Sequence, residues 1–98
     1  MGASAKNAQF LLESRLADAA RGHPQAYFDL GIAYSCGTGG VDIDLIAAHK
    51  WFNLAAVNGM EQGQAMRAEI AEDMTAREIA EAQRQARAWI ASTSRRAA

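Results

Sequence analysis

The chain has 98 residues, enough for one domain, and half of them are hydrophobic, with alanine supplying much of that half. Ten basic and eleven acidic side chains give a net charge of −1, which offers no electrostatic reason to expect binding to nucleic acid or to an anionic membrane. No stretch approaches the ~18 apolar residues of a membrane span, so we expect a soluble cytoplasmic protein.

Apolar residues recur at spacings of three and four through most of the chain, which predicts helices and no sheet. The first predicted helix covers residues 7–21 and ends at Gly22. Its inward-facing residues are Phe10, Leu12, Leu16 and either Ala19 or Ala20. The second begins at Pro24, where a missing N–H costs nothing, and ends before Gly37.

Three more helices are predicted in the second half of the chain. The third begins at Asp44, a residue type that caps helix N-termini, and ends at Gly59. The fourth covers residues 61–73, and Thr75 with Glu78 forms a capping box that opens the fifth. The inward-facing residues of these last two helices are Met66, Ile70, Met74, Ile79, Ala82, Ala86 and Trp89.

The sequence also contains a weak internal repeat. An offset of 37 residues aligns three small residues with three others: Ala19 with Ala56, Gly22 with Gly59, and Ala26 with Gly63. The alignment then fails, because Leu30 falls on Arg67 and Tyr34 on Ala71. This pattern predicts one full repeat with a degenerate half repeat on each side.

Small and aromatic residues follow a regular spacing between positions 26 and 59. In order they are Ala26, Leu30-Gly31, Tyr34, the turn Gly37-Thr38-Gly39-Gly40, Val41, Asp44, Ala48, Trp51-Phe52, Ala55-Ala56 and Gly59. This spacing resembles the Sel-one-like repeat, whose two helices carry Ala, Leu-Gly and Tyr, then Ala, Trp-Phe, Ala-Ala and Gly. One extra glycine in the turn departs from the family's pattern.

The resemblance implies an all-α fold of about five helices, in which antiparallel helix-turn-helix repeats stack into a superhelix like that of tetratricopeptide repeats. A single domain would span residues 1–91, with the full repeat at 24–59 and a degenerate N-terminal half repeat at 7–22. Capping helices at 60–91 would follow, as in small bacterial members of the family. We expect residues 92–98 to be a flexible tail.

A shared core is expected between the paired helices of the repeat. Gly31 is expected where two helix backbones approach, because a side chain there would collide with the neighbouring helix. Aromatic side chains fill the space that the small alanines leave. The predicted core residues are Ala26, Tyr27, Leu30, Gly31, Tyr34, Ala48, Trp51, Phe52, Ala55, Ala56 and Gly59.

The family's members are non-catalytic adaptors that bind a protein or peptide on a concave surface, which the first helix of each pair lines. At about 100° per residue, Phe28 and Ile32 point away from Leu30 and toward that surface. The predicted protein-binding residues are Gln25, Phe28, Asp29, Ile32, Ser35 and Cys36. The pattern does not decide whether Phe28 and Ile32 are exposed or covered by a neighbouring helix. Phe28→Glu is expected to leave the fold intact and to abolish binding.

No catalytic, cofactor or metal site is predicted. The glycine-rich turn lacks the Gly-Lys-Ser/Thr ending of a phosphate loop, and Asp44 is better explained as a cap than as a cation ligand. His23 and His49 are far apart, and Cys36 is the single cysteine, so no metal-ligand spacing and no internal disulfide exist. Both histidines are expected to be solvated.

Three alternatives accompany the adaptor hypothesis. A small regulator or inhibitor could occupy a partner's functional site with an acidic face made of Glu61, Glu69, Glu72 and Asp73. A basic nucleic-acid binder is the weaker hypothesis, and it would use Arg77, Arg84, Arg87, Arg95 and Arg96. A pairing of Glu81 with Arg84 favours an ordinary solvated face instead. Homodimerisation is a further hypothesis, because two and a half repeats are few for a continuous core.

Overall fold

The computed structural model describes the backbone of residues 2–97 and the side chains of residues 7–94. Within that part of the chain there are five helices and no strand, which confirms the predicted all-α fold class. The helices are α1 (Gly2–Ala20), α2 (Pro24–Cys36), α3 (Leu45–Val57), α4 (Glu61–Ala71) and α5 (Ala76–Ala97).

Local capping signals fix most of the helix ends. The Asp44 carboxylate accepts a hydrogen bond from the Ala47 backbone N–H at 3.1 Å, as predicted for the start of α3. Thr75 and Glu78 form the predicted capping box before α5. The Thr75 N–H donates to the Glu78 carboxylate at 2.8 Å, and the Glu78 N–H donates to the Thr75 hydroxyl at 3.1 Å. Gly37 ends α2 in the left-handed conformation, at φ 70°.

Helix α5 continues past Ser92, where we predicted a tail, to Ala97. The segment contains neither glycine nor proline to stop the helix. The Thr93 hydroxyl donates to the backbone carbonyls of Trp89 and Ile90, at 2.9 and 3.2 Å, and so stays within the helical turn. Helix α1 also begins earlier than predicted, at Gly2, and α4 ends two residues earlier than predicted, at Ala71.

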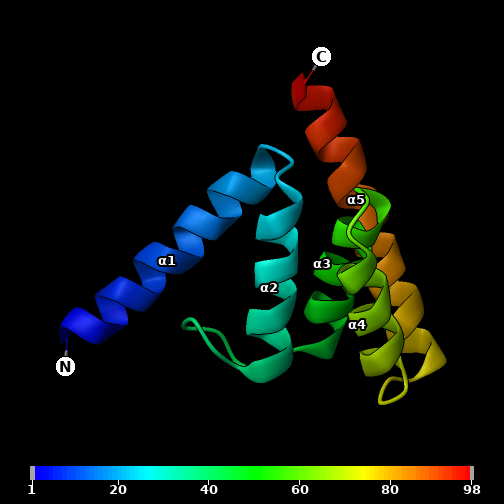
Figure 1. Cartoon of the computed structure of the whole chain (residues 1–98), viewed down its shortest axis with the longest axis horizontal. Coiled ribbons are helices and arrows are strands. Elements are labelled where there is room, and N and C mark those ends of the chain that lie inside the picture. The colour runs from blue at the N-terminus through cyan, green and yellow to red at the C-terminus, as the bar shows by residue number, and fades with distance from the viewer. Residues whose placement is uncertain (1, 98) are drawn as a thin grey trace.

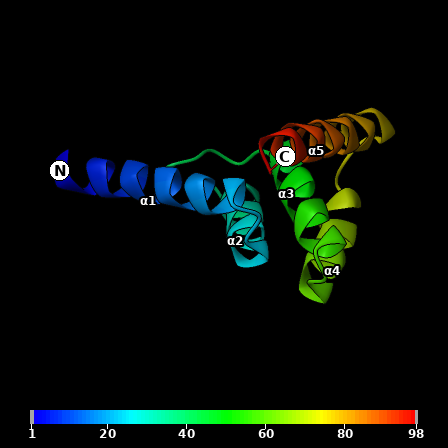
Figure 2. The same ribbon diagram turned by 90° about the horizontal axis from the view of Figure 1, so that it is seen from above.

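Helices α2 to α5 run alternately down and up in Figure 1. Helix α3 packs against α2, α4 and α5, whereas α1 packs against α2 at the edge of the molecule. Seen from above, α2 and α4 lie toward one side and α5 toward the other, and α1 extends away from the rest (Figure 2). Two surfaces therefore flank α3, one bordered by α2 and α4 and the other by α5.

The core is divided between these two sides of α3. The larger cluster joins α1, α2, α3 and α5, and contains Ala19, Ala26, Tyr27, Leu30, Trp51, Leu54, Ala55 and Ala86. The smaller joins α3 to α4, with α2 packed against it, and contains Ala48, Phe52 and Ile70. Aromatic rings hold the larger cluster together: Trp51 stacks on Tyr27 with ring centroids 6.0 Å apart and meets the edge of Trp89 at 4.9 Å.

Most predicted core residues are buried, with a few exceptions. Tyr34 and Ala56 are only half-buried. Gly59 is exposed, and it serves the turn after α3 with φ 95° instead of the core. Phe10, predicted to face inward, is 73% exposed, because α1 contacts the body mainly through its second half, where Leu12 and Leu16 pack against the core.

Two glycines make room for Phe52 and its backbone. A Cβ at Gly31 would lie 2.5 Å from the Phe52 ring, so Gly31 accommodates an aromatic ring and not the helix backbone we predicted. The close backbone approach occurs at Gly63 on α4. A Cβ there would lie 2.8 Å from the Phe52 carbonyl oxygen and 3.0 Å from the Ala56 nitrogen. Glycine at this position therefore sets how closely α4 packs on α3.

Candidate functional site

The six residues predicted to bind a partner form one stripe along α2. The Gln25 side-chain amide donates to the Asp29 carboxylate at 2.9 Å, which joins the two polar residues at the N-terminal end of the stripe. The Ser35 hydroxyl donates to the Ile32 carbonyl at 3.0 Å and is thus turned toward its own helix. Cys36 is exposed with a free thiol at the end of the stripe.

Phe28 and Ile32, the apolar pair of this stripe, are half-buried. The Phe28 ring meets the Phe52 ring of α3 with centroids 5.5 Å apart, and both apolar side chains pack against the smaller core cluster. Neither full exposure nor full coverage describes them. The expectation that Phe28→Glu leaves the fold intact stays a prediction, and against it stands the fully buried Phe52 ring that a carboxylate at this position would face.

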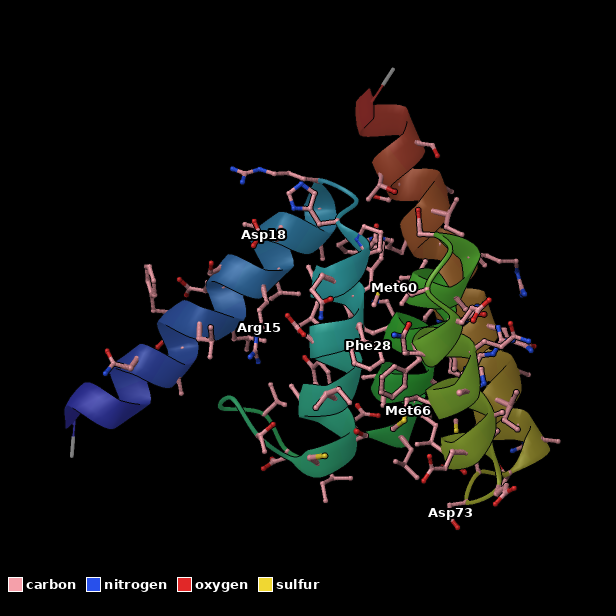
Figure 3. The ribbon with its side chains drawn as sticks, in the orientation of Figure 1. Arg15, Asp18, Phe28, Met60, Met66 and Asp73 are labelled. Carbon is pink, nitrogen blue, oxygen red and sulfur yellow. The ribbon has the colours of Figure 1, made fainter. Side chains whose placement is uncertain are left out.

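Helix α4 supplies the opposite border of the same surface. Met66 is half-buried and packs against the same cluster as Phe28, and Figure 3 shows Phe28 projecting from α2 toward α4 near Met66. Glu69 is exposed one turn further along α4, and the exposed Asp73 lies in the turn that follows the helix, as Figure 3 shows. We call this surface the α2–α4 face, defined by Gln25, Phe28, Asp29, Ile32, Met66, Glu69 and Asp73.

The charge of the α2–α4 face is acidic. Helix α2 contains no lysine or arginine, and Arg67 is the only basic residue of α4. The Arg67 guanidinium is half-buried and donates a hydrogen bond to the Asn53 side-chain oxygen on α3, so it is turned toward the interior. The carboxylates of Asp29, Glu69 and Asp73 therefore border the apolar strip without a neighbouring cation on their own helices.

The prediction that His49 is solvated is wrong, because only 3% of its surface is exposed and its Nδ1 atom has no hydrogen-bond partner. Burial lowers the pKa of this imidazole, and the nearby Arg67 guanidinium lowers it further. The error arose because α3 packs against α4 and α5 as well as α2, so little of the helix surface is left for solvated side chains. His23 is exposed.

Side chains that could bind a metal ion are dispersed over the described part of the chain. Within the part of the chain that the structure describes, no three His, Cys, Asp or Glu side chains gather closely enough to hold a metal ion. Asp44, weighed as a cation ligand in the glycine-rich turn, uses its carboxylate to cap α3.

Shallow clefts occur elsewhere on the molecule. One of about 390 Å³ lies where the α1–α2 turn meets the ends of α3 and α5, and Val57 and Ile90 line it. Another, of about 350 Å³, lies between α3 and α5 and is lined by Lys50, Arg84, Gln85, Ala88, Trp89 and Ser92. These clefts face away from the stripe predicted on α2.

The adaptor hypothesis concerned the second and fourth helices but named contact residues only on the second. Met66 was predicted to face inward, and Glu69 and Asp73 were assigned to the acidic face of the regulator hypothesis. The 37-residue offset relates the two helices, because it carries Asp29 onto Met66 and Ile32 onto Glu69. The proximity of Lys50 to Trp89 had no such signal, since it depends on how α5 crosses α3.

None of the helices in the described part of the chain combines the length and apolar character needed to cross a membrane. Comparisons of the chain with protein-family models, with curated proteins and with solved structures found no match.

Proposed function

We propose that the chain is a non-catalytic interaction module of the Sel-one-like kind that binds a protein segment on its α2–α4 face. The residue pattern from Ala26 to Gly59 supports the family assignment, and the alternating direction of α2 to α5 agrees with stacked helix pairs (Figure 1). The bound segment would carry apolar side chains and basic residues.

One observation carries this proposal: a half-buried apolar strip of Phe28, Ile32 and Met66 is bordered by exposed or partly exposed carboxylates. Apolar anchors in partly desolvated positions supply most of the energy of protein interfaces. Carboxylates at the border favour partners of opposite charge and raise the association rate. An amphipathic segment with leucines and lysines matches both features.

The test uses a fluorescently labelled amphipathic peptide of leucines and lysines, and a counterpart in which every lysine is glutamate. We expect the lysine peptide to bind the full chain saturably and the glutamate peptide to fail. The double variant Glu69→Lys with Asp73→Lys alters exposed side chains only, and should weaken binding at least about tenfold at low salt.

Ile32→Glu places a charge within the apolar strip and should abolish binding. Val57→Glu is the matched control, because it makes the same kind of change at an exposed apolar residue at the end of α3, outside the face. Equal binding by wild type and by an Ile32→Glu variant that melts at the same temperature would contradict the proposal.

The regulator hypothesis has a specific observation in its favour, since Glu61, Glu69, Glu72 and Asp73 are all exposed. Such a face could occupy a basic active or nucleic-acid site of a partner. Binding that collapses when the salt concentration rises would favour this function, whereas binding through apolar anchors keeps most of its strength.

The nucleic-acid hypothesis depends largely on Arg95 and Arg96, whose side chains lie outside the described residues. Of the other three arginines, Arg84 pairs with Glu81 at 2.6 Å, as predicted. That pair lowers the pKa of Glu81 to about 2 through hydrogen bonds from Arg84 and Gln85. The protein-partner hypothesis is therefore better supported than the nucleic-acid hypothesis.

A further inference from the structure

Lys50 lies on the opposite side of α3 from the α2–α4 face. It is two residues before Phe52, so the two side chains leave the helix about 200° apart. Its ammonium group lies 4.3 Å from the Trp51 ring centroid and 5.3 Å from the Trp89 ring centroid. Two indole rings therefore hold the cation in one place, and Trp89 links it to α5.

The Lys50 charge has no carboxylate partner within the described part of the chain. The ion pairs there join Arg21 to Asp18 and Arg84 to Glu81. Burial lowers the pKa of Lys50, because the half-buried ammonium loses part of its hydration. A bound anion would compensate that loss and favour the charged form.

Lys50 lines the cleft between α3 and α5, which we call the Lys50 cleft. Its lining residues are Lys50, Arg84, Gln85, Ala88, Trp89 and Ser92. An ammonium, a hydroxyl and the half-buried Trp89 indole line the cleft, and no acidic residue does. The Arg84 and Gln85 side chains, which also line it, already donate to the Glu81 carboxylate. A cation beside an aromatic surface suits an organic anion.

We propose that the Lys50 cleft binds the C-terminal carboxylate of a partner protein whose last residue carries an apolar side chain. This site is separate from the α2–α4 face and does not depend on it. The carboxylate would accept hydrogen bonds from the Lys50 ammonium and the Ser92 hydroxyl, and the adjoining apolar group would cover the Trp89 indole.

The charge balance of the cleft favours a carboxylate over a phosphate. Glu81 already neutralises Arg84 through two hydrogen bonds, at 2.8 and 2.6 Å. One uncompensated cation is left, which matches the single charge of a carboxylate. A phosphate monoester carries a charge of about −1.5 to −2 at neutral pH, which a single ammonium would leave partly uncompensated.

The experiment titrates the full chain with N-acetyl-leucine and, separately, with its uncharged counterpart N-acetyl-leucinamide. The indole N–H of Trp89 donates to the Tyr27 hydroxyl at 3.3 Å, and its NMR resonance, assigned by comparison with Trp51, serves as the reporter on the cleft. We expect N-acetyl-leucine to shift this resonance saturably, and the amide to bind at least about tenfold more weakly, because charge-assisted hydrogen bonds are lost.

Two variants test the residues. Lys50→Met keeps an apolar stem over the indoles and should lose at least about tenfold in affinity, while Arg87→Met, which removes an exposed cation outside the cleft, should change nothing. Ala88→Glu alters an exposed lining residue, so it keeps the test open if Lys50→Met does not fold, and it should abolish binding by repulsion.

Three results would overturn the proposal. They are equal binding of the acid and the amide, undiminished binding by a folded Lys50→Met or Ala88→Glu variant, and displacement of N-acetyl-leucine by an equal concentration of inorganic phosphate. The last would show an unselective anion site and not a carboxylate site.

Discussion

The imidazole of His49 is removed from solvent inside the packing of α3, and its Nδ1 atom lacks a partner. A buried group of this kind destabilises the fold whenever it must carry a charge. Burial first, and the Arg67 guanidinium second, lower its pKa below the ordinary value near 6.5. The neutral form therefore belongs to the folded state, and acidification works against folding.

We predict that the protein loses stability as the pH falls below about 6.5, because His49 then binds a proton in the unfolded chain but not in the folded chain. The loss is at most about 1.4 kcal/mol per pH unit and stops at the folded pKa. Urea unfolding at pH 7.5 and 5.5 measures it. His49→Leu should remove the difference, and His23→Gln, at the exposed histidine, should retain it. A wild-type stability that is flat over this range would show that His49 is protonated within the fold.

At the scale of elements, the closest contact between helices lies where Gly63 of α4 meets α3. A methyl group at Gly63 would meet the Phe52 carbonyl oxygen at 2.8 Å and the Ala55 Cβ at 2.9 Å, so one helix must move. Backbone atoms cannot yield as the tip of a flexible side chain can. Phe28 and Met66 both pack against the cluster that contains Phe52, so the spacing of α3 and α4 also sets the shape of the α2–α4 face.

Gly63→Ala should destabilise the protein by about 1–3 kcal/mol, although alanine favours a helix over glycine by about 1 kcal/mol. Thermal and urea unfolding measure the change. Gln64→Ala, at the adjacent exposed position, is the control and should fall within about 0.5 kcal/mol of wild type. A Gly63→Ala variant that is more stable than wild type would mean that α4 packs less tightly on α3 than described.

The difference between local contacts and contacts between distant helices explains which features the sequence could predict. The starts of α3 and α5 depend on capping by Asp44 and Thr75, and the start of α2 on Pro24 at its first position, so local patterns sufficed. The burial of His49 and the position of Lys50 over Trp89 depend on contacts between helices far apart in sequence. No spacing within one helix reveals which neighbour will cover it.

At the scale of the whole molecule, the helices leave three surfaces with different chemistry. The α2–α4 face is apolar and acidic, the Lys50 cleft presents a cation beside an indole, and the outer part of α1 is apolar. The first two lie on opposite sides of α3, so two partners, or two parts of one partner, could bind without competing. Occupancy of one site would then leave affinity at the other unchanged unless α3 itself moves.

The third surface bears on self-association. Helix α1 packs against α2, while Phe10 and Leu11 remain 73% and 43% exposed on the part that extends from the body (Figure 2). Burying a side chain such as Phe contributes roughly 1.5–3 kcal/mol, and end helices of stacked repeats need a cover of some kind. A second copy offers the same apolar helix, so a symmetric contact would cover both.

We therefore expect the chain to form a concentration-dependent dimer through α1. Sedimentation equilibrium over a wide concentration range measures it, and Phe10→Glu should shift the equilibrium to monomer, since a buried pair of carboxylates would face each other across the contact. Val57→Glu, at the last residue of α3, whose side chain is 60% exposed, serves as the control and should dimerise like wild type. Wild-type chain that sediments as a monomer at the highest concentrations would leave α1 uncovered by a second copy. A dimer that persists in Phe10→Glu would place the contact on another surface, and the loss of peptide binding on dimerisation would identify that surface as the α2–α4 face.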